Sequence, residues 1–120
     1  MIGAQPAERG TPGQHLREAA EALLDRYPTA PAAETESAIA MFTLWALDAV
    51  EVGHLVPADA DALFTLLDDE IDDERTGPVL SDSIAQLLFD GMTLHDWGTP
   101  FAPDVNQMRA LALSILRAPS

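Results

Sequence analysis

Apolar residues recur along most of this chain with the three- and four-residue spacing of amphipathic helices. One such stripe runs from about Gln14 to Tyr27 and ends before Pro28, which cannot continue the hydrogen bonding of a helix. A second run, from about Ala32 to Val52, is apolar on nearly every side. Gly53 suits the C-terminal cap of this second helix.

The second run determines the architecture that we expect. A helix that is apolar almost all round is buried against several neighbours, so we place it at the centre of the fold. Trp45 lies midway along it and is expected deep in the core. Trp97 lies in a polar loop and is expected to be only partly covered.

Three further helices are expected in the second half of the chain. The short middle one can be capped by Ser81 or Ser83 and is expected to stop at Gly91. No segment shows the alternating pattern of a strand. The three helices are expected at residues 57–74, 81–91 and 104–117.

The pattern therefore predicts an all-α, single-domain bundle of about five helices packed around a central hydrophobic helix. The bundle is expected over residues 14–118. Residues 1–13 carry three glycines and two prolines without periodicity, so we expect a flexible N-terminal tail there.

Composition narrows the functional classes. The 120 residues are 48% hydrophobic, which is too apolar for a disordered chain despite a net charge of -14. A surface this acidic repels nucleic acid and anionic lipid, so we expect neither direct nucleic-acid binding nor membrane binding. It favours a basic protein surface as the partner. Without cysteine there is no disulfide or zinc–thiolate site. The N-terminus does not resemble a signal peptide, and we expect a cytoplasmic protein.

One acidic segment stands out. Acids that lie four residues apart on a helix repel each other by roughly 0.2–0.5 kcal/mol per pair, and negative charge at a helix C-terminus opposes the helix dipole. The segment therefore gains nothing locally for the fold. It is either a solvated surface or a docking surface for a basic protein, and we take the second as the hypothesis. Its acids are Asp68, Asp69, Glu70, Asp72, Asp73 and Glu74.

Other acids suggest a metal site as the alternative. The sequence Glu51-Val-Gly-His54 is similar to the Glu-x-x-His motif of di-iron carboxylate bundles, and Asp48 lies on the same side of the helix. The pairs in Glu18-Ala-Ala-Glu21 and Glu70-Ile-Asp-Asp73 resemble those with which all-α nucleotide pyrophosphatases hold magnesium. These similarities imply a metal-dependent enzyme or metal-binding protein, with Asp48, Glu51 and His54 as the metal ligands.

Two shorter motifs complete the candidates. Asp82-Ser83-Ile84 resembles the Asp-Ser-Leu at which carrier proteins attach phosphopantetheine. In the second motif, His95, Asp96 and Trp97 lie together in a loop bounded by glycine and proline, where functional residues often occur. These three residues either form a recognition loop or hold that loop in place.

The sequence thus favours a small acidic helical protein-binding module that acts by occluding a basic partner surface. Inhibitors, antitoxins, immunity proteins and nucleic-acid mimics act in this way. We expect no cofactor and favour binding over catalysis. The sequence leaves the identity of the partner and the oligomeric state open.

Overall fold

A computed structural model describes residues 12–27, 29–73 and 80–117 of the chain. All regular structure in these residues is helical, so the predicted all-α class is confirmed. Residues 1–11 of the expected tail and Glu74 of the acidic segment lie outside the described part. The helices are α1 (Pro12–Arg26), α2 (Ala32–Glu51), α3 (Pro57–Asp73), α4 (Asp82–Gly91), the short 3₁₀ helix η2 (Leu94–Asp96) and α5 (Val105–Arg117).

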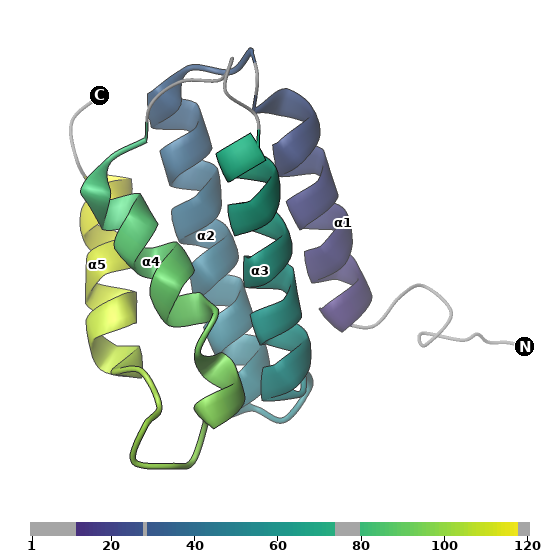
Figure 1. Ribbon diagram of the computed structural model, residues 1–120, viewed down its shortest axis with the longest axis vertical. Coiled ribbons are helices and arrows are strands. Elements are labelled where there is room, and N and C mark those ends of the chain that lie inside the picture. The colour runs from purple at the N-terminus through teal and green to yellow at the C-terminus, as the bar shows by residue number, and fades with distance from the viewer. Residues whose placement is uncertain (1–11, 28, 74–79, 118–120) are drawn as a thin grey trace, which may run out of the picture.

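The helices pack around α2, which contacts each of the other four α-helices. In the view of Figure 1, α2 lies behind α3 and α4, with α5 on the left and α1 on the right. The helix α3 also contacts α1, α4 and η2. This arrangement places α3 and α4 side by side on one side of the molecule.

Local sequence explains where the helices begin and end. At the end of α2, Gly53 has a φ of 80°, a left-handed conformation that glycine adopts without a steric penalty. At the start of α5, the Asp104 carboxylate accepts a hydrogen bond from the backbone N–H of Gln107 at 3.1 Å. Ser81 precedes α4 as expected, although its hydroxyl caps no amide. Its own N–H instead donates to the Glu36 carboxylate of α2 at 2.7 Å.

The core contains one large apolar cluster contributed by all the helices. Phe42 of α2 and Phe64 of α3 meet edge to face, with ring centroids 5.3 Å apart and an interplanar angle of 70°. Edge-to-face contacts of this kind stabilise a core by more than the burial of their apolar area alone. Gly91 ends α4 as expected: it is the last helical residue, and it is also buried directly against the Phe64 ring.

The prediction for Trp45 was wrong, because its side chain is 54% exposed. Trp45 lies on the side of α2 opposite to its buried residues, together with Met41, which is 38% exposed. The neighbouring α1 presents small alanines here and does not cover the indole. Trp97, as predicted, is partly buried and packs against the core.

Within the described residues, no helix combines the length and the apolar character that crossing a membrane requires.

Candidate functional site

The acidic segment lies at the C-terminal end of α3. The side chains of Asp69 and Glu70 are exposed, and that of Asp68 is partly buried. Asp72 and Asp73 continue the helix, and nothing is described of their side chains. The two exposed carboxylates are therefore the described members of the segment that a partner can reach.

The structure extends this segment into an acidic surface, because α4 packs beside α3. Together, α3 and α4 contain nine acidic residues and no basic residue, whereas α1, α2 and α5 contain seven acidic residues and four arginines. The negative charge is thus concentrated on one side of the molecule. We call the outward side of α3 and α4 the α3–α4 face.

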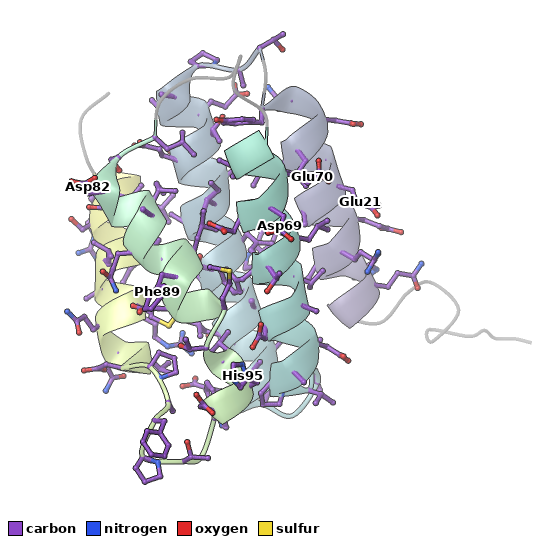
Figure 2. The ribbon with its side chains drawn as sticks, viewed as in Figure 1. Glu21, Asp69, Glu70, Asp82, Phe89 and His95 are labelled. Atoms are coloured by element: carbon purple, nitrogen blue, oxygen red, sulfur yellow. The ribbon has the colours of Figure 1, made fainter. Side chains whose placement is uncertain are left out.

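This face also carries an aromatic residue that was not among the candidates predicted from the sequence. Phe89 is 61% exposed, and it lies on the outward stripe of α4 with Asp82 and Gln86. Figure 2 labels it on α4, with Asp69 and Glu70 on the neighbouring α3. A helical wheel predicts this placement, since Ile84, Leu87, Leu88 and Gly91 form the buried stripe and Phe89 falls opposite them.

The loop after α4 is attached to the N-terminal half of α3 by one acid. The Asp61 carboxylate binds the imidazole Nδ1 of His95 and accepts a hydrogen bond from the His95 backbone N–H at 3.3 Å. It also accepts one from the hydroxyl of Thr65 at 3.3 Å. The hydrogen bond to Asp61 raises the pKa of His95 above its usual value, and the nearby charge of Asp96 raises it further.

The other two residues of the candidate recognition loop serve local structure. The backbone carbonyl of Asp96 accepts hydrogen bonds from the N–H and the hydroxyl of Thr99, at 2.9 and 2.7 Å. Trp97 packs against the core. Since His95 is held by Asp61, each of the three residues has a described contact within the fold, and their role in recognition stays a prediction.

The residues of the alternative metal site are engaged otherwise. Arg109 of α5 binds both Asp48 and Glu51 of α2, with nitrogen–oxygen distances of 2.7 and 2.5 Å. His54 is exposed in the turn after α2. Across the part of the chain that the structure describes, no three histidines or acids come together as a set that could hold a metal ion.

The described residues of the remaining motifs do not come together in one site either. Glu18 accepts a hydrogen bond from Gln14, and Glu21 forms an ion pair with Arg17, so both point along the surface of α1. Ser83 is partly buried in the first turn of α4, which ends after ten residues.

Comparisons of this chain with protein-family models, with curated proteins and with solved structures found no match. The candidate site therefore stands on the geometry described above.

Proposed function

We propose that this protein is a small acidic binding module whose α3–α4 face covers a basic surface of a partner protein. The observation that carries the proposal is the separation of charge: α3 and α4 hold nine acids without a base, and α4 also carries the exposed Phe89. The module acts by occlusion and needs no catalytic group. Its effect on the partner is to block the surface that the partner would present to another molecule.

Charge and Phe89 have different roles in this mechanism. The acidic field speeds the encounter with a basic partner and rejects acidic ones, but exposed ion pairs add little affinity. Affinity comes from a few buried anchors, which are most often aromatic residues or arginine. Phe89 provides such an anchor, because its ring is already exposed and would enter an apolar pocket of the partner. Asp69 and Glu70 then pair with arginines or lysines around that pocket.

The test is capture of partners from the lysate of the host, with the purified protein immobilised through its N-terminus. Three variants are compared by quantitative mass spectrometry: Asp69→Asn combined with Glu70→Gln, Phe89→Ala alone, and Glu18→Gln combined with Asp25→Asn. The first and the last remove the same charge, but only the first removes it from the α3–α4 face.

We expect basic proteins captured by the parent to be lost with the first variant and with Phe89→Ala, and retained with the α1 control. Elution by raised salt should follow, because the encounter is electrostatic. Equal losses for the two charge variants would mean that capture reports net charge alone. That result would overturn the assignment of the α3–α4 face.

A further inference from the structure

A second exposed apolar surface lies on the side of α2 that faces away from α3 and α4. Met41 and Trp45 are 38% and 54% exposed there. Beside them a groove of about 300 Å³ runs between α1 and α2, and its walls include the small side chains of Ala19, Ala22 and Ala38. The alanines leave room beside Trp45 that a large side chain from another molecule can fill.

One outward stripe of exposed and partly exposed residues on α2 follows the spacing of a helix–helix seam. Alternating steps of four and three residues keep one stripe of a helix against a partner helix, as in a coiled coil. Three apolar members of this stripe lie between its two acids, and a fourth follows the second acid just after the end of α2. In order along the helix, the stripe is Glu34, Ala38, Met41, Trp45, Asp48 and Val52.

The acids around this stripe are paired with arginine at each end. Near the start of α2, Glu34 pairs with Arg26 of α1. Near its end, Asp48 and Glu51 pair with Arg109 of α5. The two ends therefore resemble each other: each presents carboxylate and guanidinium groups, with the apolar residues between them.

We propose that this face binds a second copy of the chain, with the two α2 helices antiparallel about a two-fold axis between Met41 and Trp45. In this pairing Met41 lies opposite Trp45 of the partner subunit, whose indole fills the alanine-lined groove. Because the two-fold axis reverses α2, the Glu34 end of one copy meets the Asp48 end of the other. Arg26 then comes within reach of the partner subunit's Asp48.

Charge selects this face for self-association. Two copies that met through their α3–α4 faces would each bring two helices that hold nine acids and no base. The two acids of the α2 stripe, Glu34 and Asp48, instead form ion pairs with Arg26 and Arg109, which reduces the repulsion between like copies.

The size of the face is also adequate. The twenty residues of α2 span roughly 30 Å. With α1 packed beside it at about 10 Å, the two helices present on the order of 600 Å². A stable interface buries about 800 Å² per partner, so contacts from the edge of α5 would complete it. A dimer of this form leaves both α3–α4 faces exposed, and the proposal does not rest on the function proposed above.

The oligomeric state tests the proposal directly. Sedimentation equilibrium of the full chain, up to about 100 µM, should give twice the mass of 12.9 kDa that one chain has. Trp45→Asp introduces one carboxylate from each copy into the apolar seam beside the two-fold axis, and it should give a monomer. Phe89→Asp is the matched control, because it makes the same kind of change at an equally exposed residue of the other face, and it should stay dimeric. Circular dichroism checks that each variant is folded.

Two results would overturn the proposal. One is a folded parent that stays monomeric at every concentration. Trp45 fluorescence is then measured in Trp97→Phe, and its emission would shift only when an amphipathic helical peptide or an apolar dye is added. That result would assign the groove to a different ligand. The other is a dimer that persists with Trp45→Asp and is lost with Phe89→Asp.

A spin label at Ser37→Cys tests the orientation, because the chain has no native cysteine. In the antiparallel pair the two labelled positions are offset by twelve residues, or roughly 18 Å along the helix, in addition to the spacing between helices. A parallel pair would place them about 10 Å apart. Dipolar spectroscopy distinguishes the two, and the shorter distance would overturn the antiparallel arrangement.

Discussion

Gly91 of α4 lies so close to Phe64 of α3 that a Cβ atom added to the glycine would stand 2.2 Å from Cγ of the phenylalanine ring. The helices can approach this closely only because position 91 has no side chain. The contact fixes how α4 lies against α3, and so it determines the α3–α4 face.

Gly91→Ala should therefore destabilise the protein. Helix propensity alone would favour alanine by about 1 kcal/mol, but overpacking a buried contact costs roughly 1–3 kcal/mol. We expect the packing cost to dominate, with a net loss of up to about 2 kcal/mol in the free energy of unfolding, measured by urea denaturation. Phe64→Leu should relieve part of the clash, so the double variant should lose less than the sum of the single losses. A more stable Gly91→Ala would show that α3 and α4 are not this close.

Trp45 and Phe42 are neighbours on α2 with different environments, which allows a paired test of burial. Phe42 is 2% exposed, and Phe42→Ala should cost roughly 3–5 kcal/mol. Trp45→Ala should cost less than about 1 kcal/mol in the single chain, because the indole is already half in solvent. Unfolding is followed at the lowest usable protein concentration, so that association contributes least. Equal losses in the free energy of unfolding for the two variants would mean that Trp45 is buried in the core.

Arg109 connects α5 to α2 through two carboxylates, and its side chain is 23% exposed. Arg109→Met keeps most of the aliphatic stem but removes the charge. We expect a loss of about 0.5–1 kcal/mol, since exposed pairs contribute little even when they form a small network. A double-mutant cycle with Asp48→Asn should show coupling that falls as salt is raised. Zero coupling at low salt would mean that the ion pair does not form.

His95 should make the stability of the protein dependent on pH. Its folded pKa is raised above the usual 6.5 by the hydrogen bond to Asp61. A group with a raised folded pKa stabilises the fold fully below its unfolded pKa, and this contribution is lost as the pH rises through the folded value. The parent should therefore lose stability relative to His95→Gln as the pH rises above 6.5 and through the folded pKa. NMR titration of the imidazole should show a lower pKa for His95 in Asp61→Asn than in the parent.

The exposed acids near the C-terminal end of α3, Asp69 and Glu70, should contribute nothing to the stability of the free protein. Asp69→Lys, alone or with Glu70→Lys, removes repulsion near the C-terminus of α3, so we expect unchanged stability or a gain of up to about 0.5 kcal/mol. Glu21→Lys is the contrasting variant, because Glu21 is paired with Arg17 and its loss removes an attraction. A clear destabilisation by Asp69→Lys would show that this carboxylate serves the fold.

Much of the architecture was accessible from the sequence because helix formation is governed by local spacing. The apolar stripes located the five α-helices, and the acids at positions 68–74 identified the more acidic side of the molecule. Phe89 was also accessible, since the wheel of its own helix places it opposite the buried stripe.

The sequence by itself determined the fold class, the approximate helix boundaries and the excess of negative charge, because each depends on residues close together in the chain. Only the tertiary structure decided which side of α2 remains uncovered, since its apolar residues encircle the helix and do not specify where α1 and α5 stop. The same holds for Arg109 with Asp48 and for Asp61 with His95. These residues lie 61 and 34 positions apart, and only the packing of α5 on α2 and of η2 on α3 brings them together.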